Sequence, residues 1–417
     1  MKTKNSKKVI FSPNGFLLTT AFIAIIFLMN SCGNQSNQDT KNQAAKKDSV
    51  VTKTTVDSSK TTKTVTDTNV VFDRTFNDVS RYIAGMPQEP GSQFEALDKD
   101  TAWIRHARIF DQAWSMLEAR RLKPMEKWSN TELASEHKAN LNVFYPLSGP
   151  DILHVNAFFQ NAKQYNLYAL ERAGALPDLK HLTESERSNY LNDIYTSLSD
   201  VFKKSYFITH KMLSDLQREN VNGTLPLICV FLVRTNHKIV NVKYFHLNDD
   251  GSETELNKDS AAVHTNDFVK VYFRNNKDNS MQVVTYMKCD LSDGALAKNK
   301  GMMAWIKNMP TSITYLKSAS YLLHYKFFTL LRNFILDKSA SILEDDTGIP
   351  YKYLTSDKWS VSLYGTYVIP VKDFKGVTQT NLETAYKDSA KYIKQLPFSL
   401  GYHWGTNDQN LIKAERK

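Results

Sequence analysis

The chain has 417 residues, and its 53 Lys and Arg residues outnumber its 43 Asp and Glu residues, which gives a formal net charge of +10 at pH 7. This excess is spread along the chain without a basic stripe interleaved with aromatic residues, which excludes a nucleic-acid-binding surface of the usual kind. C-x-x-C, H-E-x-x-H and the phosphate-binding and dinucleotide fingerprints are all absent from the sequence, so it predicts neither a metal site nor a bound cofactor.

Residues 1–31 have the pattern of a bacterial export signal. Lysines at positions 2, 4, 7 and 8 precede an apolar run from Phe16 to Met29, which is too short for a mature membrane span. The run ends at Leu28-Met29-Asn30-Ser31-Cys32, which resembles the bacterial lipobox, although Met29 and Asn30 depart from its usual residues. The resemblance implies lipidation of Cys32, for example with palmitate. The alternative is an ordinary signal peptide in which Cys32 occurs by chance.

The segment after the cysteine is polar and cannot form a core. It has no aromatic residue up to position 70, so residues 32–70 are predicted to be the lipidated cysteine and a disordered tether. Residues 71–417 are predicted to be globular, as one domain or as two lobes near 71–222 and 223–417. The expected location is the bacterial cell envelope, with the lipid anchor in a membrane, the outer membrane by preference.

The first part of the globular region is predicted to be mostly helical. A helix is expected over Asp98–Arg121, where five residues form one apolar stripe: Trp103, Ala107, Phe110, Trp114 and Leu117. Thr183 and Glu186 fit a capping box at the start of a later helix. Between these helices, a strand at Val143–Leu147, a short helix from Ile152 and a strand at Tyr165–Leu170 predict a β–α–β unit.

The second part is predicted to be an antiparallel sheet with packed helices, which makes the fold class α+β. Two hairpins are expected, one from Leu225–Arg234 with Ile239–Leu247 and one from Phe268–Arg274 with Met281–Asp290. The remaining elements follow in order: core helices at Thr314–Leu336, strands within Ser339–Leu354 and at Trp359–Tyr364, Tyr367–Val371 and Pro397–Trp404, and a helix at Asn381–Gln395.

After Cys32, only Cys229 and Cys289 remain, and both lie in apolar runs typical of strands. In an oxidising compartment they would pair if their strands were neighbours. Two buried free thiols are an equally open alternative.

The turn Ser148-Gly149-Pro150-Asp151 carries the candidate catalytic residues. Ser148, Asp151 and His154 suit a nucleophile, an orienting carboxylate and a base. The competing interpretation, which ordinary helix-start signals favour, is that Ser148 and Asp151 cap a helix and His154 packs beside it. The triplet Asp346-Thr347-Gly348 also occurs in aspartic proteases, but a single copy in an acidic context is better explained as a turn.

The segment Tyr145-Pro146-x-Ser148-Gly149-Pro150-Asp151, with Phe158-Phe159 and Leu170-Glu171 beyond it, is similar to segments in uncharacterised exported bacterial lipoproteins. That resemblance implies an envelope location and no particular activity. The leading hypothesis is therefore a non-catalytic binding or scaffolding module, tethered to a membrane, whose partner is an envelope protein or a glycan. The alternative is an envelope hydrolase with its site at the Ser148–Asp151 turn.

Overall fold

The computed structural model describes residues 70–138, 141–207, 221–257, 267–367, 369–370, 372–404 and 409–417. The predicted export signal, the predicted lipidation site Cys32 and the predicted tether, up to residue 69, lie outside these ranges. Among the described residues, no helix combines the length and the apolar character that crossing a membrane requires.

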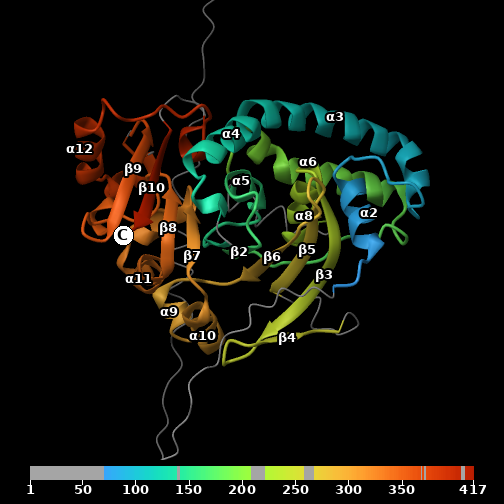
Figure 1. The fold of residues 1–417 in the computed structure, drawn as a ribbon. Coiled ribbons are helices and arrows are strands. Elements are labelled where there is room, and N and C mark those ends of the chain that lie inside the picture. The colour runs from blue at the N-terminus through green and yellow to red at the C-terminus, as the bar shows by residue number, and fades with distance from the viewer. Residues whose placement is uncertain are drawn as a thin grey trace, which may run out of the picture. The chain divides into compact units, whose positions relative to one another are not determined.

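Ten strands among the described residues form one mixed sheet in the order β4-β3-β5-β6-β2-β1-β7-β8-β10-β9 (Figure 1). Helices pack on this sheet, which confirms the predicted α+β class. Strands from both sides of residue 222 share it. The strands are β1 (Asn142–Tyr145), β2 (Gln164–Ala169), β3 (His237–Leu247), β4 (Glu253–Glu255), β5 (Phe268–Asn275), β6 (Met281–Lys288), β7 (Ser312–Leu316), β8 (Ser339–Glu344), β9 (Trp359–Gly365) and β10 (Asn410–Arg416).

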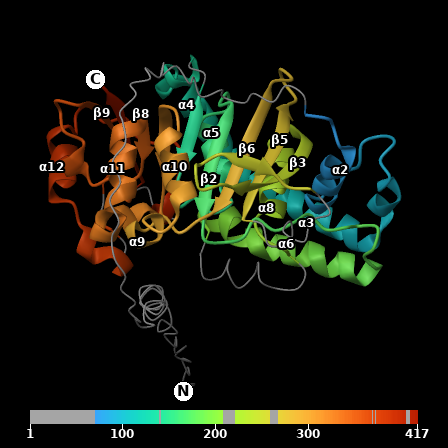
Figure 2. The same cartoon turned by 90° about the horizontal axis from the view of Figure 1, so that it is seen from below.

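Two hydrophobic cores, one on each face, enclose the sheet. The first core is covered by α2, α3, α4, α5, α6 and α8, and the second by α9 to α12 (Figures 1 and 2). The predicted stripe on α3 is confirmed, since Trp103, Phe110 and Trp114 are buried in the first core. The main helices are α2 (Arg74–Ile83), α3 (Thr101–Leu117), α4 (Lys123–Glu132), α5 (Ile152–Phe158), α6 (Glu184–Lys204), α8 (Leu225–Arg234), α9 (Asp293–Leu296), α10 (Lys300–Asn308), α11 (Thr329–Lys338) and α12 (Thr380–Asp388).

The predicted β–α–β unit lies in the middle of the sheet. Strands β1 and β2 are parallel, with Val143 opposite Tyr165, and α5 connects them. Val143 and Tyr145 face the first core, whereas Phe144 faces the second, because successive side chains of a strand point to opposite faces. The apolar character of consecutive β1 residues therefore follows from burial on both faces.

The direction of winding changes between β1 and β7. From β1 the chain winds outward to β2 and β6, then returns to place β7 on the other side of β1 and continues to β8. The helices that precede β6 in the chain cover the first core, whereas α10 and α11, which follow β6, cover the second. All these central strands are parallel, so β1, β7 and β8 end at the same edge. In such sheets, ligands bind at the carboxyl ends of the strands where the winding reverses.

Two predicted strands are wrong. Leu225–Arg234 is the helix α8, with residues Leu225 to Val233 all buried. A run that is apolar on every side gives no periodicity, so it cannot distinguish a buried strand from a buried helix. Pro397–Trp404 contains only the short 3₁₀ helix η9 (Gly401–His403), and the last strand is β10.

Other predictions in the second part hold in part. The hairpin of β5 and β6 is confirmed. The segment Thr314–Leu336 begins within strand β7, continues through the 3₁₀ helix η5 (Ala319–His324) and reaches helix α11, so it is helical only after its first residues. The described residues of Tyr367–Val371 are not in a strand.

Candidate functional site

The turn after β1 fixes Ser148 against the neighbouring strand. Leu147 and Gly149 have positive φ angles of 60° and 58°, which turn the chain sharply. The Ser148 hydroxyl donates to Gly149 O at 2.9 Å and accepts from Tyr168 N at 3.1 Å, while Ser148 N donates to Tyr168 O at 2.9 Å. These bonds join the turn to β2. Among the described contacts of Ser148 there is none with His154, so the predicted serine–histidine pair is not formed.

Asp151 and His154, in contrast, are brought together. Asp151 caps α5, because its Oδ1 accepts from His154 N at 3.2 Å, and the same oxygen lies 2.7 Å from His154 Nδ1. Its Oδ2 accepts from the Tyr145 hydroxyl at 3.1 Å. Asp151 is 2% exposed and His154 is 0% exposed. The predicted cap at Asp151 is thus present, and its carboxylate also belongs to a buried polar network. Ser148 does not cap the helix as predicted, because its hydroxyl bonds to Gly149 and Tyr168 instead.

Lys317, which directly follows β7, completes this network and was not singled out from the sequence. Its Nζ donates to Asp151 Oδ2 at 2.6 Å and to Ser205 O at 2.9 Å, and it lies 3.1 Å from His154 Nδ1. Lys317 is 3% exposed. Burying an ammonium group is expensive unless a carboxylate and further acceptors surround it, as they do here.

The pKa shifts are consistent with a buried Asp151–Lys317 ion pair beside a neutral imidazole. Burial lowers the pKa of His154 and favours its neutral form. Burial opposes ionisation of Asp151, but His154 and Lys317 outweigh it and hold the pKa of that carboxyl well below its usual range. Burial lowers the pKa of Lys317, and Asp151 opposes that shift.

Two further carboxyl groups lie where β8 ends. Asp345 Oδ2 accepts from Ser318 N at 3.2 Å, and Asp346 Oδ2 accepts from the Tyr321 hydroxyl at 2.6 Å. Asp346 Oδ1 also accepts from Asn410 at 3.3 Å. Both aspartates are buried, and burial raises the pKa of each. The Asp346-Thr347-Gly348 triplet does follow a strand as a turn, but its first residue faces the protein interior.

The carboxyl ends of three parallel strands therefore bring polar groups together. Asp151 follows β1, Lys317 and Ser318 follow β7, and Asp345 follows β8. Hydrogen bonds join them across the point where the winding of the sheet reverses. This is the candidate functional site, and we call it the switch-point site.

Comparisons with family models, curated proteins and solved structures found no match. The interpretation of the switch-point site therefore depends on its own geometry. Within the described ranges, no group of three or more His, Cys, Asp or Glu side chains is arranged to hold a metal ion.

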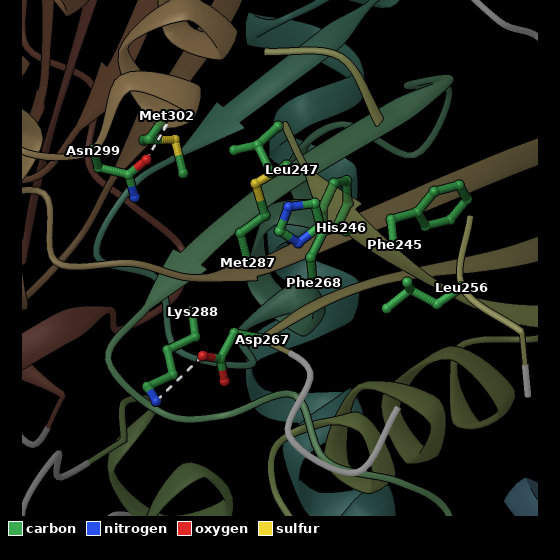
Figure 3. Close-up of a pocket in the computed structure, with 10 residues that line it drawn as sticks. All are labelled: Phe245, His246, Leu247, Leu256, Asp267, Phe268, Met287, Lys288, Asn299 and Met302. Carbon is green, nitrogen blue, oxygen red and sulfur yellow. Dashed lines mark hydrogen bonds and ion pairs between the residues drawn. The ribbon is translucent and has the colours of Figure 1, made fainter. Parts of the chain in front are cut away.

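A separate pocket lies at the same sheet edge, beside the end of β6 (Figure 3). It has a volume of about 350 Å³, and polar and apolar groups contribute about equally to its walls. At its rim, Lys288 Nζ is 3.4 Å from Asp267 Oδ2, and Asn299 Oδ1 accepts from Met302 N at 2.9 Å. The lining residues are Phe245, His246, Leu247, Leu256, Asp267, Phe268, Met287, Lys288, Asn299 and Met302. None of them belongs to the switch-point site.

The two cysteines of the folded part are not paired. Cys229 lies in helix α8 and Cys289 directly follows β6, and both are buried free thiols. Burial raises the pKa of each thiol to about 12, which makes them poor nucleophiles at neutral pH.

Glu171, just beyond β2, gives a pH-dependent prediction. It is 3% exposed, its Oε1 has no hydrogen-bond partner among the described residues, and burial raises its pKa to about 7 from 4.5. Its protonated form therefore stabilises the fold fully below about pH 4.5, and this contribution is lost as the pH rises through about 7. We therefore compare the free energy of unfolding of Glu171→Gln with that of the wild type. As the pH rises from 4.5 to 8, this difference should grow by on the order of 3 kcal/mol in favour of the variant. Urea unfolding at several pH values measures this difference, and parallel pH profiles would contradict the prediction.

Proposed function

We propose that the chain is a lipid-anchored protein of the bacterial envelope whose folded part binds a small polar ligand at the switch-point site. The export signal and Cys32 support the envelope location, and the tether of residues 32–70 supports a folded part held away from the membrane. The observation that carries the binding proposal is the convergence of Asp151, Lys317 and Asp345 from three strand ends.

The energetics of the network favour a role beyond stability. A buried ion pair such as Asp151–Lys317 is often no more stabilising than apolar side chains of the same volume. Asp345 and Asp346 add to the cost, because burial disfavours their charged forms. Burying these polar groups costs free energy, and they lie at the sheet edge where ligands bind in proteins of this topology. Binding of a ligand is the simplest explanation for both facts.

The geometry does not favour a hydrolase that uses the Ser148–Asp151 turn. Ser148 has both its hydrogen and a lone pair committed to Gly149 and Tyr168. Asp151 is committed to the α5 cap and to Lys317. The Ser148–Asp151 turn therefore acts as a rigid support for the switch-point site and not as a catalytic centre.

A thermal-shift screen of the full chain in detergent tests the proposal. The compounds are saccharides, peptidoglycan fragments, nucleotides and amino acids. A ligand present at 100 times its Kd stabilises the folded state by about 2.7 kcal/mol, which raises Tm by roughly 5–10 °C. We expect Asp345→Asn to abolish the shift caused by a hit.

Lys288→Ala, at the separate pocket beside the end of β6, is the control and should leave that shift unchanged. The reverse pattern, with the shift lost in Lys288→Ala and kept in Asp345→Asn, would place the ligand in the pocket and refute the switch-point proposal. A screen without any hit would also count against it.

A further inference from the structure

The pocket beside the end of β6 has an apolar floor. Four buried side chains form it, each at most 8% exposed: Phe245 from β3, Phe268 from β5, Met287 from β6 and Met302 from α10. The rings of Phe245 and Phe268 lie with their centroids 5.4 Å apart. Aromatic rings and methionine sulfur both make favourable contacts with a further ring. The floor therefore suits a flat aromatic body.

Close main-chain packing holds α10 against the turn between β3 and β4, so these two sides of the pocket are fixed relative to each other. A Cβ atom added to Gly301 would lie 2.5 Å from Asn248 O, and one added to Gly251 would lie 2.7 Å from Trp305 N. Only glycine permits both approaches. The pocket volume of about 350 Å³ lies in the range of about 300–1,000 Å³ that is typical of small-molecule sites.

Asn299 provides a hydrogen-bond donor at one end of the pocket. Its Oδ1 accepts from Met302 N at 2.9 Å as the cap of α10, and its amide nitrogen has no hydrogen-bond partner among the described residues. The exposed Lys298 and Lys300 flank it in the sequence and add positive potential. This end therefore favours an anionic group that accepts hydrogen bonds.

Lys288 provides a positive charge at the other end. Figure 3 shows the side chains of Asn299 and Lys288 on different sides of Met287. Lys288 Nζ lies 3.4 Å from Asp267 Oδ2, and these two side chains are 44% and 42% exposed. Such an exposed pair contributes little to stability, so the ammonium group can exchange this contact for a ligand carboxylate at small cost.

We propose that this pocket binds an aromatic dicarboxylate. The ring of the ligand lies on Phe245 and Phe268. One carboxylate pairs with Lys288, and the other accepts from the Asn299 amide. The three lysines at the two ends outnumber the single aspartate, so the charge of the pocket is complementary to a dianion. The pocket is separate from the switch-point site, and this proposal does not depend on the ligand proposed there.

Isothermal titration calorimetry of the full chain in detergent tests the proposal with terephthalate. A dianion stays out of the micelles, and a titration into detergent alone gives the blank. We expect terephthalate to bind about 10-fold more tightly than p-toluate, which has a methyl group in place of one carboxylate. The neutral diol p-xylylene glycol should not bind measurably. Equal binding of all three compounds, or no binding of terephthalate, would overturn the proposal.

Three variants assign the contacts. Lys288→Ala and Asn299→Asp should each weaken terephthalate binding about 10-fold. Aspartate caps a helix as well as asparagine does, so the loss in Asn299→Asp comes from the removed donor and the added negative charge and not from unfolding. Asp267→Asn removes the carboxylate that competes for Lys288 and should tighten binding. Weaker binding in Asp267→Asn would contradict the predicted arrangement.

Two further variants are controls. Lys307→Ala removes an exposed lysine near the other end of α10, and Asp345→Asn alters the switch-point site. Both should bind terephthalate like the wild type. A loss in Lys307→Ala equal to that in Lys288→Ala would mean attraction by surface charge alone, and a loss in Asp345→Asn would place the dicarboxylate at the switch-point site. Either result would show that the pocket is not the binding site.

Discussion

Lys317→Met is expected to lower the free energy of unfolding by about 3–5 kcal/mol, because it removes one partner of a buried ion pair. Lys317 Nζ lies 2.6 Å from Asp151 Oδ2, and both side chains are almost fully buried. Methionine fills similar space, so the loss comes from the uncompensated Asp151 carboxylate and not from a cavity. Urea unfolding followed by circular dichroism measures the change.

Two variants control this experiment. Lys317→Met combined with Asp151→Asn removes both charges and should recover part of the lost stability. Lys387→Met breaks an exposed pair in which Lys387 Nζ lies 2.8 Å from Glu383 Oε1, and it should cost at most about 0.5 kcal/mol. If Lys317→Met is no more destabilising than Lys387→Met, the buried pair is not ionised in the folded protein.

Gly174→Ala is expected to destabilise the protein by more than about 4 kcal/mol, the range in which single substitutions act through a severe structural conflict. Gly174 has φ +69°, and an added Cβ would lie 1.7 Å from Asn222 O and 2.7 Å from Gly223 Cα. These atoms are main chain and cannot rotate away. Ala175 N also donates to Asn222 O at 2.9 Å, which holds the two segments together. Tm measured by calorimetry should fall by more than 10 °C.

Gly294→Ala is the matched control, because an added Cβ meets nothing within 4 Å and the residue lies in helix α9. Alanine favours a helix over glycine by up to about 1 kcal/mol, so this variant should be neutral or slightly more stable. An unchanged Tm in Gly174→Ala would show that the crossing of the two segments opens readily and that Gly174 is not required for it.

Local patterns predicted those elements whose structure depends on near neighbours. The stripe on α3 was visible because Trp103, Phe110 and Trp114 recur at helical spacing. The capping box at α6 was visible because Thr183 and Glu186 are three residues apart. Helix α8 and strand β10 were missed, since an apolar run without periodicity and a short final strand acquire their structure from what packs against them.

The same distinction applies to the switch-point site. Asp151 and His154 were singled out from the sequence because a helix-start signal places them three residues apart. Lys317 is 166 residues from Asp151, so no motif of fixed spacing links the two. Asp346 was a candidate because it begins an Asp-Thr-Gly triplet. Its burial beside Asp345, however, depends on the packing around the end of β8.

The sequence by itself therefore determined the α+β class, the β–α–β unit and the cap at Asp151, because periodicity, turn residues and capping act over a few residues. The envelope location remains a prediction from the composition of residues 1–70. Only the tertiary structure decided that Lys317, Ser318 and Asp345 meet Asp151. The physical reason is that the order and direction of strands in a sheet are set by burial of both faces across the whole chain, and that order alone brings the ends of β1, β7 and β8 to one place.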